Sequence, residues 1–192
     1  AYLVYYKIGN TYRELKKYPE AVGTYNEAIK RNKNHIGTHN NLGITYYDLK
    51  DYEKAAASYL KAIEINPEYQ LAYNNLGNAY DKLGKYEEAI SSYQKAIQID
   101  ANYDTCYYNL GRLYYRLDRY EEAVNILNKA IRINPQYVLC YYYLGCAYAM
   151  MKDYTSAAEV YDQIIELNKE WAEKLLKVIA EEKQGDSGAP LD

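Results

Sequence analysis

The segment Leu42-Gly43-Ile44-Thr45-Tyr46 is the clearest indication of the fold, because its Leu-Gly pair and its Tyr recur at a constant interval along the chain. The pair stands at Ile8-Gly9, Leu42-Gly43, Leu76-Gly77, Leu110-Gly111 and Leu144-Gly145. The tyrosine three residues after each glycine is Tyr12, Tyr46, Tyr80, Tyr114 and Tyr148. A fixed period of this kind is the signature of a repeat architecture, in which stacked units bury a continuous core. The sequence therefore predicts five tandem units.

Each unit contains two helical patterns. In the second unit, Leu42, Tyr46 and Leu49 are spaced as on one face of a helix. A second apolar face follows at Tyr52, Ala55, Ala56, Tyr59, Ala62 and Ile63. Asn66-Pro67 ends this second helix, because proline disfavours helical backbone at the residue before it. We therefore expect an all-α fold.

These positions resemble the tetratricopeptide repeat family, whose motif places an aromatic, Leu, Gly, Tyr, Ala, an aromatic, Ala and Pro within roughly 34 residues. The resemblance covers units 2–35, 36–69, 70–103, 104–137 and 138–171. It implies a right-handed superhelical solenoid of tandem helix-turn-helix repeats. The departures are His39 at the aromatic position and Lys33, Ala101 and Lys169 at the proline position.

The two ends of the array differ. An apolar stripe with interleaved charges predicts a capping helix over 172–183, which covers the last hydrophobic surface of the solenoid. We expect 184–192 to be a flexible tail. No matching cap precedes Ala1, so we expect the natural protein to extend further and the uncapped first repeat to self-associate.

Composition excludes several classes of protein. Hydrophobic residues make up 49% of the 192 residues and charged residues 26%, which argues against disorder. The net charge of −3 is too small to indicate nucleic acid or a membrane as partner. Cys106, Cys140 and Cys146 lack C-x-x-C spacing, which favours reduced, buried thiols and a cytoplasmic location. The 28 tyrosines without a single phenylalanine have no explanation at this level.

No constellation of residues predicts an enzyme, a cofactor or a metal site. His35 and His39 are four residues apart, but the junction between two units separates them. The stretch 185–190 resembles the nucleophile loop of trypsin-like proteases, but that chemistry needs a histidine base and an aspartate on a β scaffold.

The residues that the repeat does not need for its core indicate binding. The family resemblance implies that the first helix of each unit lines a concave face. The candidate peptide-binding residues on that face are Asn10, Asn41, Asn75, Asn78, Asn109, Tyr108, Arg112, Arg116, Tyr142 and Tyr143. Asparagine is a mediocre helix former, so its recurrence favours function, with consensus drift as the alternative. Each amide offers a donor and an acceptor to a peptide backbone.

The asparagine ladder resembles the one in the repeat region of O-linked N-acetylglucosamine transferase. The hypothesis is a protein–protein interaction scaffold that binds an extended polypeptide in the groove, as part of a larger protein. An engineered or consensus-like repeat without an evolved ligand is the alternative. A co-chaperone that clamps acidic C-termini is disfavoured, because Tyr6, Leu71 and Asn75 occupy the places of the required cations.

Overall fold

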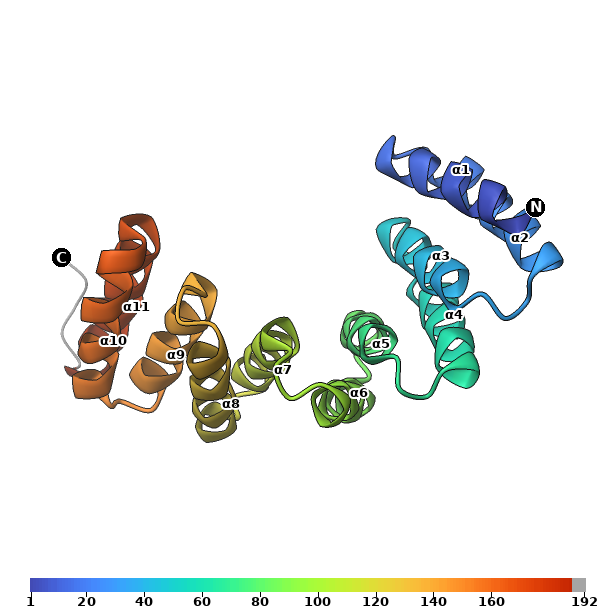
Figure 1. Ribbon diagram of the computed structural model, residues 1–192. Coiled ribbons are helices and arrows are strands. Elements are labelled where there is room, and N and C mark those ends of the chain that lie inside the picture. Colours follow the sequence, from blue (N-terminus) through green and yellow to red (C-terminus); the bar gives the residue numbers. More distant parts are fainter. Residues whose placement is uncertain (188–192) are drawn as a thin grey trace. The chain divides into compact units, whose positions relative to one another are not determined.

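The computed structural model describes residues 1–187, and these residues form eleven helices joined by short turns (Figure 1). The helices are α1 (Tyr2–Glu14), α2 (Tyr18–Arg31), α3 (Ile36–Asp48), α4 (Tyr52–Ile65), α5 (Gln70–Lys82), α6 (Tyr86–Ile99), α7 (Asp104–Arg116), α8 (Tyr120–Ile133), α9 (Val138–Met150), α10 (Tyr154–Leu167) and α11 (Lys169–Ser187). The first ten helices form five pairs, one for each sequence repeat. The predicted all-α solenoid of tandem helix pairs is confirmed.

The chain divides into two compact units, Ala1–Ala101 with α1–α6 and Asn102–Asp192 with α7–α11. In unit 1, α1 contacts α3 and α3 contacts α5, while α2 and α4 each pack against the first helix of the next pair. In unit 2, α7 contacts α9 and α9 contacts α11. We call the surface of α1, α3 and α5 the odd-helix face of unit 1. The surface of α7, α9 and α11 is the odd-helix face of unit 2.

The first helix of each pair ends in the same backbone motif. One residue in each turn has a positive φ, and these residues are Lys16, Lys50, Gly84, Asp118 and Lys152. The next backbone N–H donates to the carbonyl of the repeated tyrosine, as from Lys17 to Tyr12 at 2.8 Å. This is a Schellman cap, and only Gly84 adopts its left-handed conformation without a steric penalty. The constant period of the sequence therefore places an identical turn in every repeat.

The last helix corrects two predicted boundaries. Oδ1 of Asn168 accepts a hydrogen bond from the backbone N–H of Trp171 at 3.1 Å. This N-cap starts α11 at Lys169, so the helix is longer than the predicted cap at 172–183 and includes the end of the predicted fifth unit. Residues 184–187 of the predicted tail are helical, in continuation of the good helix formers Glu181–Lys183. The rest of that tail, 188–192, lies outside the described residues.

In the first four pairs, the repeated glycine of the first helix lies directly against a side chain of the second helix. A Cβ atom on Gly77 would lie 2.6 Å from the ring of Tyr93, which is completely buried. The fifth pair is different, since Leu175 of α11 lies 2.5 Å from a Cβ built on Gly145. Leu175 is completely buried, whereas Tyr161, at the repeat position of Tyr93, is partly exposed. Helix α11 therefore supplies the side chain that completes the core of unit 2.

We predict that Gly77→Ala destabilises the protein, because the added methyl group would lie 2.6 Å from the ring of Tyr93, which is completely buried. Overpacking of this kind costs about 1–3 kcal/mol, measured by urea denaturation followed by circular dichroism. Gly23→Ala is the matched control, because a Cβ on Gly23 of α2 meets nothing within 4 Å. Alanine favours a helix over glycine by about 1 kcal/mol, so the control is stabilised. Stabilisation of both variants would contradict the close packing.

We also predict that Leu175→Ala destabilises unit 2 by about 2–4 kcal/mol, because it opens a cavity beside Gly145. Leu176→Ala, on the same helix, changes an exposed side chain and leaves the stability almost unaltered. Thermal unfolding monitored by circular dichroism compares the two variants. Equal stability of both would show that α11 does not complete the core.

Candidate functional site

A network of side-chain amides joins the helices of unit 1. Oδ1 of Asn10 accepts a hydrogen bond from the Tyr25 hydroxyl at 2.7 Å and another from Nδ2 of Asn41 at 2.9 Å. Nδ2 of Asn41 also donates to the hydroxyl of Tyr6 at 3.2 Å. These bonds connect α1, α2 and α3 at the odd-helix face.

The network continues from α3 to α5. Nδ2 of Asn75 donates to Oδ1 of Asn40 at 3.1 Å. Within each helix a longer bond links neighbouring amides, from Asn40 to Asn41 at 3.4 Å and from Asn74 to Asn75 at 3.5 Å. Asn40 is only 5% exposed, so its oxygen depends on the donor from α5. The predicted ladder residues Asn41 and Asn75 therefore hold neighbouring helices together.

Asn78 repeats the arrangement of Asn10. The hydroxyl of Tyr93 donates to Oδ1 of Asn78 at 2.7 Å, as Tyr25 does to Asn10. Both tyrosines are completely buried, and burial raises the pKa of Tyr25, so its phenol stays protonated as a donor. A donor fixed on Oδ1 sets the amide orientation, and the NH₂ groups of Asn10 and Asn78 then remain available. The need for this hydroxyl explains tyrosine rather than phenylalanine at these two positions.

The predicted asparagines therefore differ in what they can offer a ligand. The expectation that every amide offers a ligand both a donor and an acceptor is wrong for Asn41, because both of its N–H groups are engaged within the protein. Oδ1 of Asn41 and Oδ1 of Asn75 receive only the long bonds from their neighbours and keep acceptor capacity. Asn109 lies on α7 in unit 2, where it is 8% exposed.

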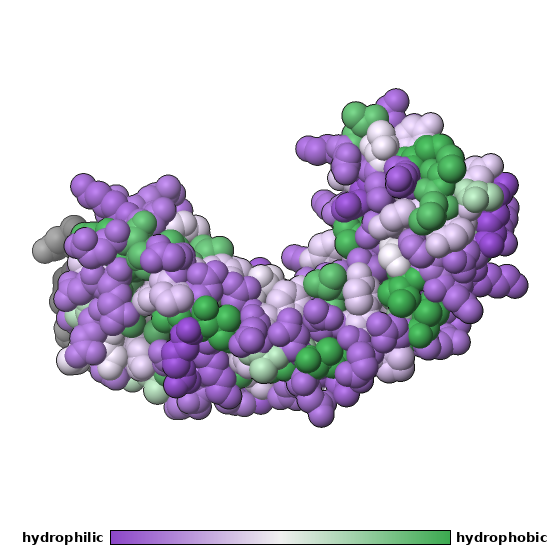
Figure 2. All heavy atoms as spheres, in the orientation of Figure 1, coloured by the Kyte–Doolittle hydropathy of each residue, from purple (hydrophilic) through white to green (hydrophobic). Residues whose placement is uncertain are grey.

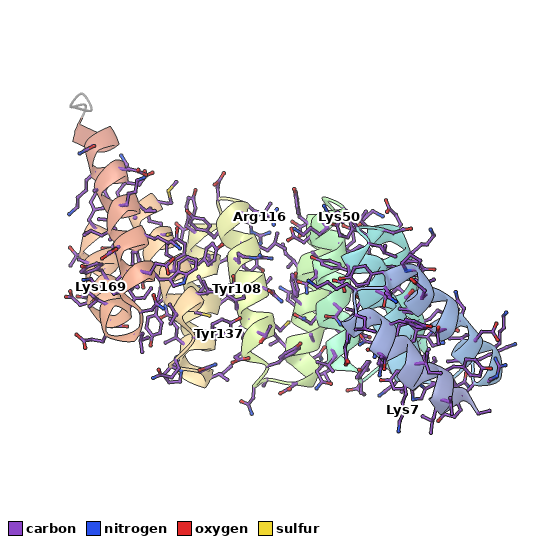
Figure 3. The ribbon with its side chains drawn as sticks, turned by 90° about the horizontal axis from the view of Figure 1, so that it is seen from above. Lys7, Lys50, Tyr108, Arg116, Tyr137 and Lys169 are labelled. Atoms are coloured by element: carbon purple, nitrogen blue, oxygen red, sulfur yellow. The ribbon has the colours of Figure 1, made fainter. Side chains whose placement is uncertain are left out.

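The odd-helix face of unit 2 carries a cluster of aromatic rings. Tyr108 and Tyr137 lie near each other (Figure 3), with ring centroids 5.1 Å apart. The Tyr108 centroid also lies 5.9 Å from that of Tyr143. The Tyr142 centroid lies 5.3 Å from Tyr143 and 4.9 Å from Trp171. Burial raises the pKa of Tyr142 to about 12, with smaller contributions from Cys146 and Tyr143. The predicted tyrosines of α7 and α9 therefore come together.

The two predicted arginines border this aromatic cluster differently. The guanidinium carbon of Arg112 lies 5.8 Å from the ring centroid of Tyr108, within the range of a cation–π contact. Arg116 is exposed at the last position of α7 (Figure 3). The odd-helix face of unit 2 therefore combines apolar ring edges with positive charge from the arginines of α7.

The residues that support both faces do not stand out in the sequence pattern. Tyr25 and Tyr93 each follow their asparagine by 15 residues, and this shared spacing is a signal that could have identified them. Tyr137 precedes α9 and Trp171 belongs to the terminal helix, so neither occupies a first-helix position of the repeat. Their place in the cluster depends on contacts between helices.

The histidines and cysteines have structural environments. Nε2 of His39 donates to the backbone carbonyl of Lys33 at 2.7 Å, and Nδ1 of His35 lies 2.7 Å from Oγ1 of Thr38. Burial, and then the neighbouring His39, lowers the pKa of His35. Across 1–187, no three His, Cys, Asp or Glu side chains are grouped so that they could hold a metal ion. Cys106, Cys140 and Cys146 are buried thiols, and burial raises the pKa of each of them to about 12.

Within the described part of the chain, no helix combines the length and the apolar character that crossing a membrane requires.

The fold and the faces of the odd-numbered helices define a helical-repeat protein that presents side chains in rows. Models of the tetratricopeptide repeat match residues 2–68, 36–102 and 70–136, and a second such model matches 108–170. The chain belongs to the tetratricopeptide repeat family. These repeats make it a scaffold for protein–protein interaction. Comparison with curated proteins gives no match.

Solved structures of tetratricopeptide proteins share the fold. A crystal structure of MamA is 25% identical to the chain with a TM-score of 0.79, covering 100% of this chain and 97% of MamA. MamA from Desulfovibrio magneticus RS-1 is 22% identical, with a TM-score of 0.79 and coverage of 88% and 96%. YrrB, described as a tetratricopeptide protein with an unusual peptide-binding site, is 19% identical, with a TM-score of 0.74 and 90% coverage of both chains.

We predict that Asn75→Ala destabilises unit 1 by about 1–2 kcal/mol, because it leaves Oδ1 of the buried Asn40 without its donor from α5. Asn26→Ala is the matched control, since Asn26 is exposed on α2 and alanine is the better helix former by a few tenths of a kcal/mol. Urea denaturation measures both variants. If Asn75→Ala were as stable as Asn26→Ala, the amide network would not hold α3 to α5.

Proposed function

We propose that the odd-helix face of unit 1 binds the backbone of an extended polypeptide segment. The fixed orientation of two amides carries this proposal: the buried hydroxyls of Tyr25 and Tyr93 hold Oδ1 of Asn10 and of Asn78 at 2.7 Å. A fixed amide loses little conformational entropy when it binds, so its hydrogen bonds contribute more to affinity. Asn10 and Asn78 are half-buried, which leaves their NH₂ groups within reach of a ligand.

The amides of Asn10, Asn41, Asn75 and Asn78 together offer both the donors and the acceptors that the backbone of an extended chain needs. The NH₂ groups of Asn10 and Asn78 donate to peptide carbonyls. Oδ1 of Asn41 and Oδ1 of Asn75, which receive only long intramolecular bonds, accept from peptide N–H groups. Because every residue of a ligand except proline carries both backbone groups, this recognition tolerates many ligand sequences.

The odd-helix face of unit 2 favours different ligand groups. Tyr108, Tyr142 and Tyr143 present partly exposed rings, which suit apolar side chains of a ligand. Arg112 and Arg116 add positive charge beside these rings and favour carboxylates. YrrB, a protein of this fold with an unusual peptide-binding site, is consistent with a peptide-binding role for this chain.

The test replaces the NH₂ groups of Asn10 and Asn78, which are the proposed donors, by oxygen atoms and leaves the shape of the side chains unchanged. We predict that Asn10→Asp and Asn78→Asp keep the fold, because a carboxylate oxygen still accepts from Tyr25 or Tyr93. The second carboxylate oxygen replaces the NH₂ group and repels a peptide carbonyl. Each change should lower affinity about tenfold or more, measured by fluorescence anisotropy with a labelled peptide that is selected from a random display library against the full chain.

Asn26→Asp is the control for this experiment, because it makes the same change of charge on an exposed position of α2. Circular dichroism confirms that all three variants are folded. Equal affinity of the two test variants and the control would contradict the proposed backbone recognition.

A further inference from the structure

A cavity of about 430 Å³ lies at the junction of the first two repeats, lined by residues of α2, α3, α4 and the turn that joins α2 to α3. We call this space the junction cavity. Ile29 near the end of α2 and Ile65 at the end of α4 give it apolar walls, and His39 of α3 also lines it. Figure 2 shows hydrophobic side chains beside hydrophilic ones at the surface over α4. A cavity of this size suits a small ligand with an apolar body.

Two departures from the repeat motif line the junction cavity. His39 occupies the aromatic position, which is a tyrosine in the other four repeats, and Lys33 occupies a position that is proline in two repeats. Nε2 of His39 donates to the carbonyl of Lys33 at 2.7 Å, as the hydroxyl of Tyr141 donates to the carbonyl of Pro135 at 3.2 Å. Histidine therefore keeps the hydrogen bond of the motif with a smaller ring, and the space that it does not fill stays open to a ligand.

The rim of the junction cavity is mainly cationic. Lys30, Lys33 and Lys61 line it together with a single carboxylate, that of Glu64. Lys61 pairs with Glu64 at 2.6 Å, and Lys30 pairs with Glu27 at 2.6 Å. Lys33 is exposed and forms no ion pair within the described part of the chain. Its ammonium group is therefore available to an anionic ligand.

We propose that the junction cavity binds a small monocarboxylic acid, with the apolar body against Ile29 and Ile65 and the carboxylate at Lys33. The apolar walls supply most of the affinity, because removal of apolar surface from water drives binding and an exposed ion pair adds little. The ion pair with Lys33 selects an acid over its uncharged analogue.

The surroundings favour a single negative charge over the double charge of a phosphate. Helices α2 and α4 both end at the cavity, and the C-terminus of a helix carries a partial negative charge. The carboxylate of Glu64 adds a further negative charge to the lining. A dianion meets more repulsion here than a monoanion does, so the ligand is a carboxylate.

The junction cavity is separate from the proposed peptide site. None of the residues that line it takes part in the amide network of Asn10, Asn41 and Asn75 on the odd-helix face of unit 1. The acid site therefore does not rest on the proposed recognition of a peptide backbone.

The experiment titrates the full chain with naphthoate and follows the backbone amide signals by nuclear magnetic resonance. Naphthamide is the matched ligand with the same apolar body and no charge, and acetate carries the charge without the body. We expect a dissociation constant of about 0.1–1 mM for naphthoate, because so small a ligand gains limited free energy. Naphthamide should bind about three- to fivefold more weakly, and acetate should not bind at these concentrations. The signals of Lys33, Asn34 and His39 should shift.

Two variants test the assignment of the ligand to the junction cavity. His39→Tyr restores the residue of the other repeats and fills the space, so naphthoate should bind about tenfold more weakly or worse. Lys33→Gln should weaken naphthoate about three- to fivefold and leave the affinity for naphthamide unchanged. Lys82→Gln is the control, because it makes the same change on an exposed lysine at the end of α5 and should alter neither affinity. Circular dichroism confirms that each variant is folded.

Three results would overturn the proposal. The first is the absence of any shift with naphthoate up to about 10 mM. The second is binding of naphthoate that folded His39→Tyr leaves intact, because the ligand would then lie elsewhere. The third is equal affinity for naphthoate and naphthamide, which would assign the cavity to an uncharged aromatic group instead of an acid. Lys33→Gln changes an exposed side chain, so the test of the charge does not depend on the folding of His39→Tyr.

Discussion

The close approach of a glycine to a buried side chain of the partner helix is the interaction on which the first four pairs in this chain depend. Gly9, Gly43 and Gly77 have no side chain, and the ring of a buried tyrosine from the second helix fills the space. The ring and the glycine must occur together, because a Cβ at the glycine would lie 2.5–2.6 Å from the ring carbons. The constant period of the sequence preserves this pairing from one repeat to the next. In the fifth pair Leu175 of α11 takes over the role of the ring, which makes the last helix part of the core.

The same tyrosines connect the core to the proposed binding surface. The ring of Tyr25 packs beside Gly9, and its hydroxyl reaches Asn10, the next residue along α1. Tyr93 does the same for Gly77 and Asn78. A change that disturbs the glycine contact should therefore also disturb the orientation of the amide. Packing and recognition depend on one side chain, which gives a physical reason for the conspicuous use of tyrosine at these positions.

The two units present different chemistry from the same scaffold. Unit 1 offers amides that are already hydrogen-bonded to one another, and unit 2 offers rings and guanidinium groups. A repeat fold permits this because its core positions are separate from the positions on the odd-helix faces.

Local patterns in the sequence were enough to predict the repeat, the helix pairs and the small residues at their contacts, because these follow from periodicity and from the steric need for Gly and Ala. They also indicated which helices carry the asparagines and tyrosines. The packing of the helices was needed to establish that Asn41 donates within the protein, that Asn40 is buried beneath Asn75, and that Trp171 joins the tyrosines of α9. These facts depend on distances between side chains from different helices, and a linear pattern does not contain those distances. The bounds of α11 likewise depended on the Asn168 cap, where one side-chain hydrogen bond sets the start of a helix.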